Sequence, residues 1–146
     1  MLQDAGFSNY RYDIFIKRVV VKKFVWGLQS EEGWATSYSN ENEDIDVLPF
    51  WSDEAYASAC AKDNWTEYQA ASIPLAEFLE NWCVGIANEN KLIGVNWDTN
   101  MFGKEVNALS LALEILKLLK IDNVNIPFFE FKDIDDFIET LNHSLN

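Results

Sequence analysis

The chain has 146 residues, 49% hydrophobic and 14% aromatic, so it is large and apolar enough to fold as one domain without a metal ion or disulfide. Aspartate and glutamate number 24 against 11 lysine and arginine residues, for a formal net charge of −13. A field of that sign repels nucleic acid and anionic lipid, so we expect neither as a partner. No run of about 18 apolar residues indicates a membrane span, and no signal peptide is recognisable, so we expect a cytoplasmic protein.

The charges are unevenly distributed along the chain. Five of the eleven basic residues fall between Arg11 and Lys23, whereas residues 24–61 contain no lysine or arginine and many carboxylates. Such a segment favours a basic partner, such as a cationic protein surface. The alternative is that acidity serves solubility alone.

Taken in chain order, the first half predicts a helix followed by three strands. Apolar residues from Tyr12 to Val20 recur at helical spacing, with Ser8 or Asn9 as the cap. Three short apolar runs then predict strands joined as a meander, at residues 24–28, 34–38 and 47–51. Gly33 suits the left-handed position of the hairpin turn between the first two, and Pro49 indicates an edge or a bulge in the third.

The second half alternates helices and strands. Ser52 is the expected cap of a helix that runs to about Ala61, and Pro74 the expected first residue of another. The remaining predicted elements are strands at 68–73, 92–97 and 124–131, and helices at 75–88, at 105–120 and after Asp133.

This order predicts an α+β fold, in which a small, largely antiparallel sheet of about five strands is covered by helices, with the N-terminal helix first. We expect residues 1–121 to form a single α+β domain and residues 122–146 a strand–helix tail packed on it. The helix at 105–120 is apolar around much of its circumference, so either the tail or a second copy must cover it, and a homodimer through this helix is possible.

Five separated motifs resemble one bacterial family, catalogued as domain of unknown function 2750. In order they are Trp26-Gly27-Leu28, Glu31-Glu32-Gly33-Trp34-Ala35, Leu48-Pro49-Phe50-Trp51, Ile73-Pro74-Leu75 followed by Glu77-Phe78-Leu79 and Trp82, and Gly94-Val95-Asn96-Trp97. The resemblance spans about Tyr10 to Leu116, and the tail from Ile121 departs from it. It implies a cytoplasmic bacterial protein and carries no activity, cofactor or site.

The residues that usually perform catalysis do not form a recognisable constellation. His143 is the single histidine and stands beside the C-terminus, so no histidine-based triad or zinc site can be built. Cys60 and Cys83 fall in predicted helices and are expected to be buried thiols in a reducing compartment. With no phosphate-binding loop or nucleophile elbow either, we expect no catalytic residue, metal or cofactor.

Tryptophans are the most informative candidates for binding. Trp26, Trp34, Trp51 and Trp97 all fall on predicted strands, and a small sheet has little room to bury four indole rings. Rings left uncovered beside acidic residues would form an aromatic, anionic patch for a cationic partner. The predicted binding residues are Trp34, Trp51, Trp97, Asp98, Glu31, Glu32 and Asp53. Core packing of each tryptophan remains the alternative.

Asp98 follows a predicted strand, where clefts often open, although the same residue type also caps its own backbone in turns.

The leading hypothesis is a non-enzymatic acidic protein-binding module, immunity- or adaptor-like, that engages a basic protein. The alternative is a small-ligand sensor or enzyme with a pocket near Trp34, Trp51 and Asp98.

Overall fold

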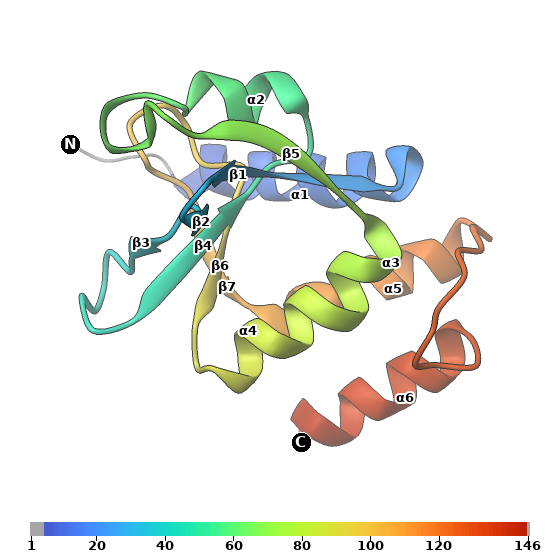
Figure 1. Cartoon of the computed structure of the whole chain (residues 1–146). Helices are drawn as coiled ribbons and strands as arrows, with labels where there is room; N and C mark the ends of the chain where they lie inside the picture. The colour runs from blue at the N-terminus through green and yellow to red at the C-terminus, as the bar shows by residue number, and fades with distance from the viewer. Residues whose placement is uncertain (1–4, 146) are drawn as a thin grey trace.

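The computed structural model describes residues 5–145, which form two small β-sheets flanked by helices (Figure 1). The first sheet has the order β2-β1-β5 and the second the order β3-β4-β6-β7. The α+β class and the leading helix are confirmed, whereas the single five-stranded sheet is replaced by two sheets. The strands are β1 (Phe24–Ser30), β2 (Gly33–Trp34), β3 (Ser37–Tyr38), β4 (Asp46–Phe50), β5 (Gln69–Pro74), β6 (Leu92–Val95) and β7 (Lys104–Asn107).

The N-terminal helix α1 (Ala5–Lys22) buries the predicted apolar face, including Phe15 and Val19, which are fully inaccessible. The helix begins earlier than expected, so Ser8 and Asn9 lie inside it and the predicted cap is wrong. It ends at Lys22, and the next residue, Lys23, has a left-handed φ of +66° and donates its N–H to the carbonyl of Val19 at 2.8 Å.

Strand β1 supplies the centre of the first sheet. It forms the predicted hairpin with β2, and Gly33 adopts the expected left-handed conformation at φ +125°. Its other edge pairs antiparallel with β5, from Phe24 opposite Pro74 to Gln29 opposite Gln69. The strand predicted at 34–38 is split into β2 and β3. These two short strands pair antiparallel with β1 and with β4, as the predicted meander requires, but they belong to different sheets.

The third predicted strand, β4, pairs parallel with β6 from Val47 to Phe50, with Pro49 opposite Gly94. The partner on the other side, β3, reaches only Asp46 and Val47, so β4 has one paired neighbour at Pro49. Proline is tolerated there because no ladder bond on the open side requires its missing N–H. An isolated bridge between Trp26 and Trp51 links the two sheets.

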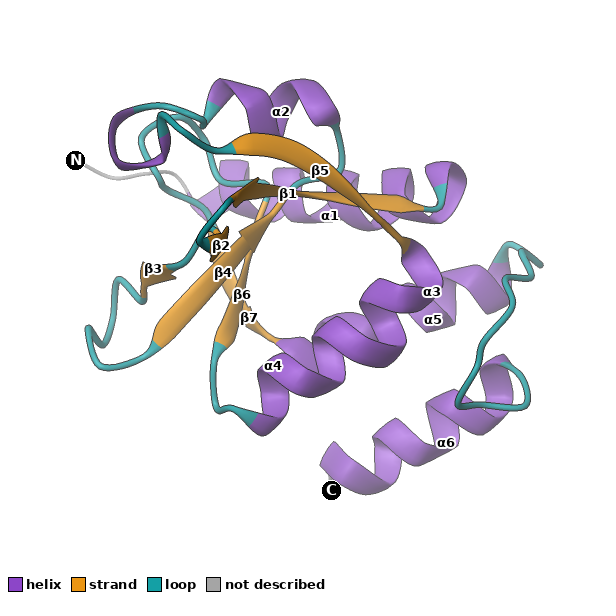
Figure 2. Ribbon diagram, in the orientation of Figure 1, coloured by secondary structure: helices purple, strands orange, loops and turns teal. Residues whose placement is uncertain are grey.

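The helical segments cover both sheets (Figure 2). Helix α2 (Glu54–Ala59) begins after Asp53 rather than after the predicted cap Ser52, and a 3₁₀ turn, η1 (Asp63–Trp65), follows. Residues 75–88 are helical throughout as predicted, passing from α3 (Leu75–Glu77) through a π-helical stretch, η2 (Phe78–Cys83), into α4 (Val84–Asn88). Pro74 ends β5 and precedes the first helical residue.

The expected helix start near residue 105 is wrong, because residues 104–107 form β7 against β6. Helix α5 (Ala108–Ile121) starts after Asn107, whose side chain accepts from the amides of Leu109 and Ser110. No helix of residues 5–145 is long and apolar enough to span a membrane.

The C-terminal residues pack on α5. The strand expected at 124–131 does not form; that stretch is an irregular connection, whose amides at Phe129 and Glu130 donate to the buried carboxylate of Glu80 at 3.0 and 2.8 Å. The last helix, α6 (Ile134–Leu145), is capped by Asp133 as predicted. Phe137 is fully buried in the main core, so the tail covers part of α5. The homodimer stays a prediction, which sedimentation can decide.

Candidate functional site

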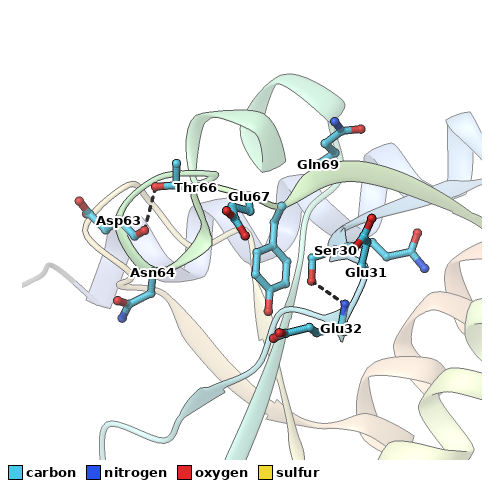
Figure 3. Close-up of a pocket in the computed structure, with 10 residues that line it drawn as sticks. Ser30, Glu31, Glu32, Asp63, Asn64, Thr66, Glu67 and Gln69 are labelled. Carbon is cyan, nitrogen blue, oxygen red and sulfur yellow. Dashed lines mark hydrogen bonds between the residues drawn. The ribbon is translucent and has the colours of Figure 1, made fainter.

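A hollow lies between the β1–β2 hairpin and the segment that enters β5, and we call it the acidic groove. Its volume is about 940 Å³. Figure 3 shows side chains from the two segments around it. The lining residues on which the argument rests are Ser30, Glu31, Glu32, Asp63, Glu67 and Tyr68.

Local structure holds both walls of this groove. On one side, the hairpin turn places Glu31 and Glu32 beside the left-handed Gly33, and the amide of Glu32 donates to Ser30 Oγ at 3.1 Å. On the other side, the η1 turn is anchored by Trp65, which is 6% exposed and packs edge-on against Trp51 at 6.5 Å between ring centroids. The groove is therefore a preformed concave surface.

The charge of the groove has one sign. Glu31, Glu32, Asp63 and Glu67 all line it, and its lining includes no lysine or arginine. Among residues 5–145, none of these four carboxylates takes part in an ion pair. Adjacent carboxylates without a counter-charge attract cations, and Tyr68, which also lines the groove, can contact a cationic head group with its ring.

The tryptophans do not supply the expected exposed rings. Trp51 is fully buried and Trp97 is 3% exposed, so the predicted aromatic patch is wrong for both. The indole of Trp51 donates to the carbonyl of Trp97 at 2.9 Å, and the ring of Trp97 lies against Gly94 and Gly103, which have no side chains. The two sheets and the two glycines therefore provide the space to bury both indole rings, which a single small sheet would lack.

Trp34 is half-buried on another part of the molecule, where its ring packs edge-on against Trp82 at 4.8 Å between centroids. Trp34 is therefore separate from the core cluster of Trp51, although Glu31 and Glu32 precede it on the same hairpin. Of the seven predicted binding residues, only the two glutamates line the acidic groove.

Asp53 is neutralised inside the fold rather than presented to a partner. Its carboxylate accepts from Arg18 at 3.0 Å and from Lys22 at 2.9 Å, which ties α2 to α1. Burial raises the pKa of Asp53, but hydrogen bonds from Ser52, Lys22 and Arg18 outweigh burial and lower the pKa below its ordinary value.

Asp98 lies where a strand end opens onto a second pocket, of about 310 Å³. Its Oδ1 accepts from the amides of Asn100 and Phe102 at 2.8 and 3.1 Å, so the residue caps its own turn and borders a cavity at once. Tyr10, Arg11, Ile14, Tyr56 and Cys60 also line this pocket.

The two cysteines are free and buried, as predicted. Burial, followed by the nearby charge of Asp98, raises the pKa of Cys60 to about 11. Burial alone raises the pKa of Cys83 well above its ordinary value. Both side chains therefore remain neutral thiols near pH 7, which is unsuited to nucleophilic catalysis.

Comparison with known proteins adds a family to this geometry. Residues 12–115, more than two thirds of the chain, match the model of a family described as "Protein of unknown function (DUF2750)". The chain belongs to the DUF2750 family. No curated protein and no solved structure matches it. The part shared with the DUF2750 family runs from α1 into α5 and includes the acidic groove and most of the pocket at Asp98, whose Tyr10 and Arg11 precede the matched residues.

The sequence interpretation missed one wall of the groove. Asp63, Glu67 and Tyr68 fall between a predicted helix and a predicted strand, in a stretch with no periodic signal. The available clue was the density of polar and acidic residues around Trp65 in that connection, because surface connections often carry binding residues. Nothing in the sequence placed that loop opposite Glu31 and Glu32.

Proposed function

We propose that this DUF2750 domain is a non-enzymatic protein-binding module, which holds a basic segment of a partner protein in the acidic groove. The observation that carries the proposal is a concave surface lined by four carboxylates and by no basic residue. An arginine or lysine side chain entering the groove would meet carboxylates from both walls and the ring of Tyr68.

The charge of the rest of the chain supports the same role. A net charge of −13 draws a basic partner toward the molecule before contact and speeds its capture. Proteins that neutralise a basic toxin, or that recruit a basic partner as adaptors, require this kind of attraction. The proposal includes a cytoplasmic location, which the two free cysteines support because thiols persist in reducing compartments.

The test uses a short fluorescent peptide rich in arginine and lysine, titrated with the full chain at low and at physiological salt. Glu31→Gln combined with Glu32→Gln removes two charges from the groove. Glu41→Gln combined with Glu43→Gln removes the same charge from an exposed loop elsewhere. We expect the groove variant to bind about threefold to tenfold more weakly and the loop variant to change little.

Because the field of the whole protein acts on any cationic peptide, the comparison between the two variants decides the matter. Equal weakening in both would show that net charge alone attracts the peptide, and it would overturn a role for the groove. Chemical-shift changes that fall outside residues 29–32 and 63–69 would do the same.

The alternative function, a small-ligand sensor or enzyme with a pocket at Trp34, Trp51 and Asp98, needs a different location. In the described structure Trp34 and Trp51 pack in different core clusters, and neither lines the pocket at Asp98. A small-molecule role therefore depends on the pocket at Asp98.

A further inference from the structure

The pocket at Asp98 lies between α1 and α2, above the end of β6, and we call it the α1–α2 pocket. Three aliphatic or aromatic side chains, Tyr10, Ile14 and Tyr56, supply much of its wall. Arg11 and Asp98 bring one positive and one negative charge to the same cavity. At about 310 Å³ its volume suits one small organic molecule.

A buried asparagine holds the floor of this pocket. Asn96 is 2% exposed and has a left-handed φ of +47°. Its Oδ1 accepts from the amide of Ser52 at 2.9 Å, and its Nδ2 donates to the carbonyl of Arg11 at 3.1 Å. One amide side chain thus joins α1, the β4–α2 connection and the end of β6, so the cavity exists before anything binds.

The walls are tied together at a second point. Arg18 of α1 donates to the hydroxyl of Tyr56 at 2.9 Å and to Asp53 at 3.0 Å, just before α2. This contact fixes the aromatic ring that faces α1. A rigid cavity of this kind costs a ligand little ordering free energy when it binds.

Arg11 is the residue whose hydrogen bonding is incomplete. Its Nε is the one buried side-chain nitrogen or oxygen of residues 5–145 without a hydrogen-bond partner, and its Nη2 reaches the carbonyl of Phe102 only at 3.4 Å. A buried donor that lacks an acceptor is destabilising, so the Arg11 guanidinium retains hydrogen-bonding capacity that the described fold does not use. A planar carboxylate matches the guanidinium best.

A simple anion is unsuitable, because the net charge of −13 and the carboxylate of Asp98 both repel it. A zwitterion carries no net charge, so the net charge of the protein does not repel it, and its positive group can lie next to Asp98. Its carboxylate can pair with Arg11, its ammonium group with Asp98, and an apolar side chain can pack against Ile14 and the two tyrosine rings.

We propose that the α1–α2 pocket binds a free α-amino acid with an aromatic or branched apolar side chain. This inference is independent of the acidic groove, which shares no lining residue with the pocket. Binding of an amino acid would make the domain responsive to a metabolite whether or not it also captures a protein.

The test follows backbone amide signals of the full chain by NMR while L-phenylalanine or L-leucine is added. N-acetyl-L-phenylalanine, which lacks the ammonium charge, and L-phenylalaninamide, which lacks the carboxylate, serve as matched probes. We expect saturable shifts at residues lining the pocket with the amino acids, and about tenfold weaker binding with each blocked derivative.

Two variants separate ligand recognition from folding. Asp98→Asn removes the charge but keeps the Oδ1 that caps the turn, and Arg11→Gln leaves the backbone carbonyl that Asn96 binds. Each should weaken amino-acid binding about tenfold without changing the rest of the spectrum, whereas Glu41→Gln should have no effect. The proposal is overturned if neither amino acid shifts the pocket signals, or if a blocked derivative binds as well as phenylalanine.

Discussion

Replacement of Gly94 by alanine tests how tightly Trp97 is packed. A Cβ at position 94 would lie 2.4 Å from Cε2 and 2.7 Å from Cζ2 of the Trp97 ring. Carbon atoms in favourable contact are about 3.5–4.0 Å apart, so the overlap is roughly 1 Å. The ring is 3% exposed and its Nε1 donates to the carbonyl of Lys104 at 3.2 Å, so it cannot move aside freely.

Overpacking of a close-packed core costs about 1–3 kcal/mol, and we expect Gly94→Ala to fall in the upper half of that range. For a chain of this size, each kcal/mol lowers the melting temperature by about 3 °C, so the expected fall is about 6–9 °C. Urea unfolding followed by tryptophan fluorescence measures the free energy of unfolding directly.

Gly85→Ala is the matched control, since the Cβ that it adds inside α4 has no heavy atom within 4 Å other than those of its chain neighbours and of its own helix backbone. It should be neutral or stabilise the protein by about 0.5–1 kcal/mol. In a Trp97→Leu background the alanine at position 94 should cost much less, because the obstructing ring is gone. Wild-type stability of Gly94→Ala alone would refute the packing described for Trp97.

Three further predictions concern the tail, the thiols and the acid side of the stability profile. Glu80→Ala removes the acceptor of two tail amides, so we expect a loss of about 1.5–3 kcal/mol and faster proteolysis within residues 123–133; an unchanged cleavage pattern would contradict the described docking. A thiol reagent at pH 8 should label neither Cys60 nor Cys83 in the folded protein and both in urea, because burial raises the pKa of each; rapid labelling of the native chain would argue against it. The lowered pKa of Asp53 stabilises the fold above the ordinary carboxyl value of 3.8, so Asp53→Asn should be less stable than wild type at neutral pH. That difference should shrink as the pH falls through the lowered pKa, and a difference independent of pH would exclude the ion pairs as its source.

Local patterns in the sequence predicted local structure well. Helical spacing located α1, the helical segment at 75–88, α5 and α6, while Gly33 and Asp133 took the turn and cap positions expected of them. The pairing between strands could not be predicted in this way, because β1 pairs with β5 and β4 with β6 across about forty intervening residues. No short-range signal specifies such partners.

In the candidate site too, the sequence predicted the residues placed by local structure and not those placed by tertiary contacts. Glu31 and Glu32 could be identified because they stand in a hairpin turn whose geometry is readable from the sequence. Burial of Trp51 and Trp97 could not, because it depends on the bridge between the sheets and on glycines that approach the Trp97 ring only in the folded chain. Tertiary contacts, rather than residue type, decided which aromatic ring reached the groove.

The order of the strands along the chain has a consequence for how the protein unfolds. The first sheet takes β1, β2 and β5, and the second takes β3, β4, β6 and β7, so each sheet is interrupted by strands of the other. No single cut divides the chain into two halves that each retain a complete sheet. Complementary fragments should consequently remain unfolded when kept apart, and heat should melt both sheets in one cooperative transition.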